Sequence, residues 1–105
     1  DKVTDEIQPK IAEVAVSSEF LTVEQGQVAG IIQDGIGYRK GKPLITLHME
    51  AYHGATESYE GVRIAGKPPI SMKIAGGIHG DIATASMVVN AIPKVIQARP
   101  HARRP

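Results

Sequence analysis

The segment from Gly76 to Asp81, GGIHGD, combines residue types that could do chemistry immediately before the most helix-like part of the chain. A histidine can transfer protons, and the free N–H groups at a helix N-terminus attract anions or carboxylates. For Asp81 we favour a structural role, as a capping or first-turn acid. The glycines do not have the Gly-x-Gly-x-x-Gly spacing of a dinucleotide site, and no parallel strand is expected after them. The segment is therefore predicted to join a strand to a helix, and His79 is either an ordinary turn residue or a polar group directed toward a cleft.

A second set of polar side chains alternates with apolar ones along LITLHMEAY, residues 44–52. In a strand, successive side chains point to opposite faces. One predicted face carries Ile45, Leu47, Met49 and Ala51, and the other carries Thr46, His48, Glu50 and Tyr52. If the alternation holds in the later strands, Arg63 and Lys73 belong to the polar face too. This face either meets water, as in many antiparallel sheets, or meets a subunit or ligand, and the pattern does not distinguish these cases.

Other chemistries are not supported by the residue types and their spacing. The chain has no cysteine, which excludes disulfides, thiolate zinc sites and a cysteine nucleophile. No helical pair of histidines or clustered ligand spacing is present among His48, His53, His79, Glu50 and Asp81. No Gly-x-Ser-x-Gly nucleophile motif occurs either. We therefore predict no metal site and no catalytic residue in this chain, because a complete active site is not apparent.

The composition is that of a single globular domain. The chain has 105 residues, of which 42% are hydrophobic and 22% charged, with a formal net charge of +1. This charge gives no electrostatic argument for nucleic-acid binding, and no apolar run reaches the roughly 20 residues of a membrane span. To the basic tail QARPHARRP, with Arg99, Arg103 and Arg104, we assign no function. The chain opens without a methionine, and we expect it to be part of a longer protein.

Hydrophobic periodicity and turn residues predict the elements that position these side chains. Residues 1–10 are predicted to be an entry segment or the end of an earlier helix, and strands are expected at 11–23, 28–40, 44–52, 58–64 and 69–75. The last element is a helix from about Gly80 to Gln97, in which Pro93 should kink the helix or split off its last turn. The expected fold class is α+β: an antiparallel or mixed sheet of about five strands, with the C-terminal helix packed on one face.

Four segments together resemble a known family, namely DKVTDEIQPKIAE, GQVAGIIQDG, ITLHMEAY and KIAGGIHGDIATASMVVNAIPKVIQARP. Over about residues 1–100 they are similar to the C-terminal domain of 2,4-diaminopentanoate dehydrogenases and native amine dehydrogenases. These enzymes share the overall plan of dihydrodipicolinate reductase. The motif of that reductase, a histidine pair followed by Lys and Asp-Ala-Pro-Ser-Gly, is absent, which favours the amine dehydrogenase branch.

The resemblance implies a two-domain oxidoreductase of the cytoplasm. An N-terminal Rossmann domain, not present in this chain, would hold NAD or NADP, while residues 1–105 would form a single domain for substrate binding and oligomerisation. The implied reaction is the oxidative deamination of 2,4-diaminopentanoate or a related amine, within ornithine degradation. Hydride would pass from the amine-bearing carbon to the nicotinamide, and water would hydrolyse the resulting imine. This chain alone is expected to be inactive.

The resemblance also suggests where the substrate is bound. His48, Tyr52 and His79 are expected to orient the diamino acid, and the helix N-terminus at Gly80 and Asp81 is expected to favour its carboxylate. The expected partners are this small molecule and other copies of the chain, joined as a homo-oligomer through the sheet, with no nucleic acid or membrane. The alternative is a non-catalytic module that binds a small ligand or serves assembly.

Overall fold

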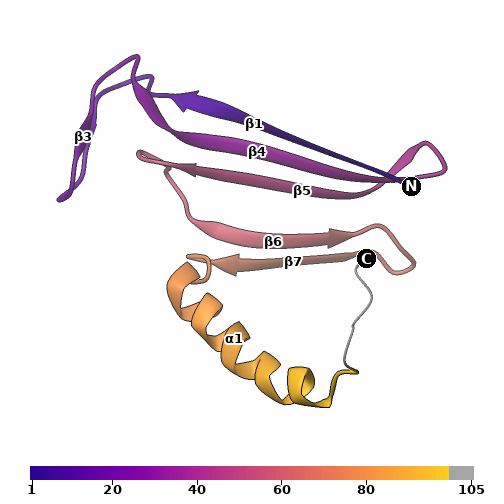
Figure 1. Cartoon of the computed structure of the whole chain (residues 1–105). Helices are drawn as coiled ribbons and strands as arrows, with labels where there is room; N and C mark the ends of the chain where they lie inside the picture. Colours follow the sequence, from indigo (N-terminus) through magenta and orange to yellow (C-terminus); the bar gives the residue numbers. More distant parts are fainter. Residues whose placement is uncertain (100–105) are drawn as a thin grey trace. The chain divides into compact units, whose positions relative to one another are not determined.

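The computed structural model of the protein describes residues 1–99, so the tail residues Arg103 and Arg104 lie outside the described part. Contacts within the chain divide it into two units, the first from Asp1 to Thr56 and the second beginning at Glu57. Figure 1 shows the order of the elements along the chain, and each unit is described by itself. No helix among the described residues is long and apolar enough to cross a membrane.

The first unit is built on a three-stranded antiparallel sheet. Strands β1 (Lys2–Ile11), β4 (Val28–Arg39) and β5 (Lys42–Tyr52) lie in the order β1-β4-β5. The hairpin between β4 and β5 turns at Lys40 and Gly41, which both have positive φ angles, 51° and 73°. The strands predicted at 28–40 and 44–52 are confirmed, and the two pair antiparallel with each other.

The prediction for residues 1–10 is wrong, because this polar segment forms β1. It pairs residue by residue with β4, from Lys2 opposite Tyr38 to Lys10 opposite Gly30. β1 is an edge strand in the described sheet. An edge strand has one side free of ladder hydrogen bonds, so it tolerates many polar residues and a proline such as Pro9.

The single strand predicted at 11–23 is also wrong, because a turn interrupts it. Two short strands, β2 (Val16–Ser17) and β3 (Thr22–Val23), pair antiparallel with each other. The turn between them is closed by Ser18, whose amide donates to the carbonyl of Leu21 at 2.8 Å. The Ser18 Oγ also accepts from the amides of Phe20 and Leu21, each at 3.3 Å. A serine hydroxyl that satisfies local amides in this way competes with a continuing strand.

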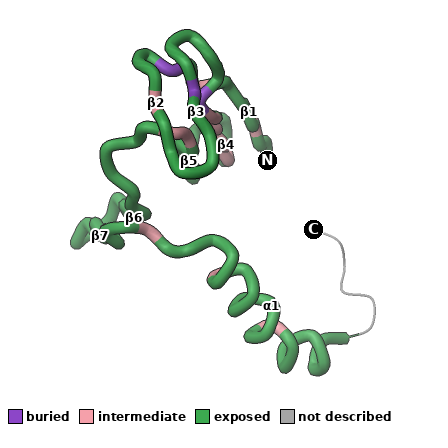
Figure 2. Tube along the Cα trace, turned by 90° about the vertical axis from the view of Figure 1, so that its left-hand side faces the viewer, coloured by how far each residue is buried: buried purple, intermediate pink, exposed green. Residues whose placement is uncertain are grey.

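The buried residues of the first unit gather at one end of its sheet. Ala12, Val23 and Ala29 are buried, and Tyr52 packs against them. The buried parts of the chain are purple in Figure 2. The backbone closes around this cluster, since the Ala12 amide donates to the Gln27 carbonyl at 2.8 Å. These three are the buried residues of the described chain. The small core therefore anchors the end of β5 that carries Tyr52.

The second unit contains a hairpin and the C-terminal helix. Strands β6 (Tyr59–Ile64) and β7 (Ile70–Ala75) pair antiparallel, and α1 runs from Gly80 to Gln97. The helix bounds agree with the prediction. Pro93 lies inside α1, and the helix continues past it to Gln97, so the last turn is not split off.

The predicted α+β class, with antiparallel strands and one C-terminal helix, is confirmed. The strands are grouped in three separate sheets within the described residues. No residue of α1 is buried, so the helix does not show the packing on a sheet face that its apolar stripe predicts.

Candidate functional site

A charged cluster crosses the strands on the polar face of the first unit's sheet. The register places His48 of β5 directly opposite Asp34 of β4, which in turn lies opposite Glu6 of β1. The His48 Nδ1 atom is 2.6 Å from Asp34 Oδ1, and its Nε2 atom is 3.0 Å from Glu50 Oε1. Period-two alternation explains the last contact, because residues two apart on β5 share a face.

The two carboxylates change the protonation of the imidazole. Hydrogen bonding to Asp34, and then to Glu50, raises the pKa of His48 above its ordinary value of 6.5. The side chains of His48, Asp34 and Glu50 are 51%, 46% and 44% exposed, so solvent reaches all three. The cluster is therefore an accessible patch that combines two anionic groups with one titrating cation.

Tyr52 lies on the same face of β5, four residues beyond His48 or about 14 Å along the strand. The ammonium of Lys10 lies 5.3 Å from the centre of its ring, a cation–π distance. Between Lys10 and Tyr52 in the register lies Gly30 of β4. The tyrosine thus lies at the end of the polar face where the small core supports it.

The glycine segment predicted to join a strand to a helix does so in the second unit. Gly76 and Gly77 have φ angles of +79° and +70°, a left-handed conformation that residues with a Cβ rarely adopt. The Gly76 amide donates to the Ser58 carbonyl at 2.8 Å, and the Ile78 amide donates to Glu60 Oε1 at 3.2 Å. The two consecutive glycines therefore turn the chain after β7. The Glu60 side chain of β6 then binds the backbone at Ile78, just before the helix.

The three residues of this segment that were predicted to bind substrate occupy successive positions at the start of α1. His79 is the N-cap residue, with an extended backbone and no side-chain cap bond, and its carbonyl accepts from the Ala83 amide at 2.9 Å. Gly80 begins α1, and Asp81 lies in its first turn, where an acid complements the helix dipole. His79, Gly80 and Asp81 thus come together at the N-terminus of α1, whereas His48 and Tyr52 belong to the first unit.

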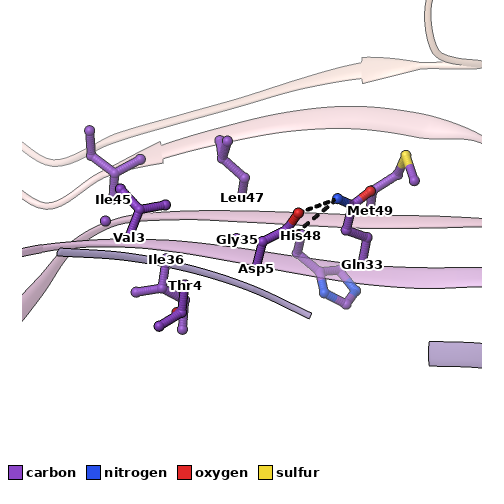
Figure 3. Close-up of a pocket in the computed structure, with 11 residues that line it drawn as sticks. Val3, Thr4, Asp5, Gln33, Gly35, Ile36, Ile45, Leu47, His48 and Met49 are labelled. Carbon is purple, nitrogen blue, oxygen red and sulfur yellow. Dashed lines mark hydrogen bonds between the residues drawn. The ribbon is translucent and has the colours of Figure 1, made fainter. Parts of the chain in front are cut away.

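A groove on the opposite face of the same sheet was missed by the sequence reasoning. Gly35 and Gly37 of β4 form its floor, and apolar side chains from the neighbouring strands form its walls: Val3, Ile45, Leu47 and Met49. Figure 3 shows these four standing on one side of the sheet, with the His48 ring on the other side. The groove has a volume of about 530 Å³. The groove could have been expected from the sequence Gly-Ile-Gly at 35–37. In a strand, these two glycines occupy successive positions on one face and leave it without side chains there.

One polar pair lies beside this groove. The Gln33 side-chain amide donates to the Asp5 carboxylate, at 2.9 Å and 3.1 Å from its two oxygens. Asp5 and Gln33 lie on the face with Gly35, so they are separated by the sheet from the His48 cluster.

The described residues contain neither a cluster of metal ligands nor a βαβ unit. Within 1–99 there is no group of three or more histidine, cysteine, aspartate or glutamate side chains that could hold a metal. All strand pairs of this part are antiparallel, so it contains no βαβ unit with a glycine-rich turn. The described part of the chain therefore contains no dinucleotide-binding unit of the Rossmann kind.

The fold and the site define an α+β domain with a charged cluster on a sheet face and no dinucleotide-binding unit in its described part. The chain belongs to the 2,4-diaminopentanoate dehydrogenase C-terminal domain family, whose model matches residues 1–104. It is therefore a domain of a dehydrogenase family, and the family expected from its sequence motifs is confirmed.

A curated relative supports the same assignment. The chain is similar to 2,4-diaminopentanoate dehydrogenase of Acetoanaerobium sticklandii, with 31% identity over 102 residues. The match covers 93% of this chain and 29% of the relative, so the chain spans less than a third of that protein's length.

Proposed function

We propose that this chain is the substrate-binding and oligomerisation domain of an NAD(P)-dependent dehydrogenase that oxidatively deaminates 2,4-diaminopentanoate or a related amine. The family match and the name of the relative support this reaction class. The observation that carries the proposal is the cluster of Asp34, His48 and Glu50 on an accessible sheet face. Two exposed carboxylates flank one imidazole there, an arrangement of ionisable groups that is typical of functional sites.

The substrate contacts are proposed to come from the polar face of β5. His48 and Tyr52 orient the diamino acid, and the carboxylates beside His48 favour its ammonium groups by charge. The N-terminus of α1, with His79, Gly80 and Asp81, is proposed by itself as a second place for a substrate group, because free helix amides and the helix dipole favour an anion. The two groups of residues belong to different units, so each is proposed independently of the other.

The nicotinamide cofactor, NAD or NADP, is proposed to be bound by another part of the enzyme. The described residues have no unit that fits a dinucleotide, and this chain by itself is expected to have no dehydrogenase activity. When bound, the cofactor supplies the hydride acceptor. The residues of this chain supply binding and orientation of the amine.

Self-association is proposed to occur through the sheet. The three-stranded sheet exposes large apolar side chains on one face, with Val3, Ile45 and Leu47 at 79%, 59% and 70% exposure. Exposed apolar surface of this kind marks a contact face in soluble proteins. A second copy is the proposed partner, and symmetric pairing is the commonest arrangement of identical chains.

The reaction is tested by an NAD(P)H-linked assay of the enzyme that contains this domain, with 2,4-diaminopentanoate and simple amines as substrates. We expect turnover with at least one of them. His48→Gln should raise KM about tenfold or more, the scale for losing hydrogen bonds to charged groups. His53→Gln is the matched control, because this histidine lies outside the cluster. Absence of turnover with every amine would contradict the proposed reaction, and binding without turnover would favour the non-catalytic module.

A further inference from the structure

The charged row across the first sheet needs a cation to be stable. Glu6, Asp34 and His48 lie directly opposite one another on three adjacent strands, and Glu50 lies beside His48 on β5. Like charges in opposite positions of an antiparallel pair destabilise it. The positive charge of His48, between Asp34 and Glu50, offsets this repulsion.

The two contacts of the imidazole specify its protonation state. An ionised carboxylate accepts hydrogen bonds and cannot donate one, while a neutral imidazole has only one N–H. Asp34 lies on Nδ1 and Glu50 on Nε2, so both contacts are hydrogen bonds only when both ring nitrogens carry protons. The observed geometry is therefore that of an imidazolium ion held between two carboxylates.

We propose that Asp34, His48 and Glu50 form a proton-operated latch between β4 and β5, in which the protonated imidazole is the positioning residue that holds the two carboxylates in place. The latch is closed while His48 is protonated. Loss of the proton removes one of the two hydrogen bonds and leaves the carboxylates of Glu6, Asp34 and Glu50 on one face without the offsetting charge. The part of this inference that concerns substrate rests on the proposed function, whereas the latch itself does not.

The surroundings of the cluster agree with this assignment. The ionisable groups on this face are Lys2, Glu6 and Lys10 from β1, Asp34 and Tyr38 from β4, and His48, Glu50 and Tyr52 from β5. Lys10 lies 3.7 Å from Glu13 and over the ring of Tyr52, and Lys2 lies over the ring of Tyr38. Both lysines are thus directed toward other partners, and His48 is the cation that contacts Asp34 and Glu50. Hydrogen bonding to Asp34, and then to Glu50, raises the pKa of His48, which favours the protonated ring of the closed latch.

The latch has a consequence for the role of His48. With both nitrogens protonated and engaged, the ring has no lone pair to accept a proton from an amine. His48 therefore acts by fixing Asp34 and Glu50 in place, and not as a general base. At the proposed substrate face, it is the carboxylates that are presented to the ammonium group.

The latch is tested by NMR titration of the His48 ring in the whole protein. Asp34→Asn and Glu50→Gln should each shift the titration midpoint of His48 to lower pH, and Asp34→Asn should shift it further. Asp5→Asn is the matched control, because Asp5 lies on the opposite face of the same sheet, and it should leave the midpoint in place. If Asp34→Asn does not fold, Glu50→Gln provides the same comparison. An unchanged midpoint in a folded variant would overturn the latch.

A second measurement separates the latch from the proposed function. Amide hydrogen exchange in β4 and β5, corrected for its intrinsic pH dependence, should become about two- to fivefold faster above the His48 midpoint, the range for exposed ion pairs. His48→Gln should abolish this change. KM for the amine should change over the same pH range, because the charge and the placement of the carboxylates both change there. If the carboxylate variants shift the His48 titration midpoint but KM does not change with pH, the latch is supported and the proposed binding of the amine on this face is contradicted. If the midpoint does not shift, the latch is contradicted, whether or not the enzyme turns over.

Discussion

The Nδ1 atom of His48 lies 2.6 Å from Oδ1 of Asp34, although the two residues are 14 positions apart in the sequence. The hairpin that turns at Lys40 and Gly41 brings their strands into register and places the two residues directly opposite each other. The contact therefore depends on the β4–β5 register, and a shift of one residue would move His48 to the other face of the sheet. The pairing of these two strands is what connects this histidine with a carboxylate.

The first prediction concerns the stability of the protein as a function of pH. The pKa of His48 is raised in the folded state above 6.5, so its stabilising contribution is fully present below pH 6.5 and is lost as the pH rises through the folded pKa. As the pH is raised through this range, the urea concentration at the midpoint of unfolding should therefore fall more for the wild type than for His48→Gln. The His53→Gln variant should follow the wild type. Parallel curves for the wild type and His48→Gln would contradict the prediction.

The second prediction concerns the close approach of β4 and β5 at Gly30. A Cβ atom there would lie 2.0 Å from the Ala51 carbonyl oxygen and 2.5 Å from the Tyr52 Cα, and backbone atoms cannot rotate away. Gly30→Ala should lower the free energy of unfolding by about 1–3 kcal/mol, the range for overpacking. In the control Gly35→Ala, the nearest atoms are Leu47 Cβ at 3.9 Å and the Thr4 carbonyl oxygen at 4.0 Å, which are ordinary contacts. Equal urea midpoints for the two variants would contradict this close approach of the strands.

The third prediction concerns the glycines before α1. Gly77 has φ +70°, where a Cβ is strained, so Gly77→Ala should destabilise the second unit by about 1–2 kcal/mol. Gly80 begins the helix and has no atom near the position of an added Cβ. Gly80→Ala should therefore stabilise the helix by up to about 1 kcal/mol, because alanine has the higher helix propensity. Amide exchange along α1 measures both effects, and similar exchange in the two variants would count against the assigned backbone conformation.

The fourth prediction concerns self-association through the apolar sheet face. Leu47 is 70% exposed, so Leu47→Glu should cost little stability in the monomer but should introduce a charge into the proposed contact between copies. Sedimentation should show the wild type as an oligomer and Leu47→Glu as a monomer. Thr46→Glu is a control on the other face of the same strand. A wild type that remains monomeric at high concentration would contradict the proposal.

Local sequence patterns were sufficient to predict several elements of the fold. The alternation over residues 44–52 assigned His48, Glu50 and Tyr52 to one face, because a strand has period two whatever its neighbours are. The glycines at 76 and 77, followed by a small-residue apolar stripe, located the start of α1 at Gly80. The first ten residues were not recognised as a strand, because an edge strand is stabilised by its neighbour more than by its own apolar content.

The sequence by itself determined the α+β class, the family and the polar face of β5, since these depend on local periodicity and on motifs that are read along the chain. The tertiary structure decided which charged groups meet. Asp34 and Glu6 had no distinguishing spacing, and they join His48 only because three strands pair in one register. Glu60 likewise contacts the segment before the helix through the fold of β6 and β7. Contacts between distant residues depend on the pairing of whole strands, and that pairing is a property of the folded chain.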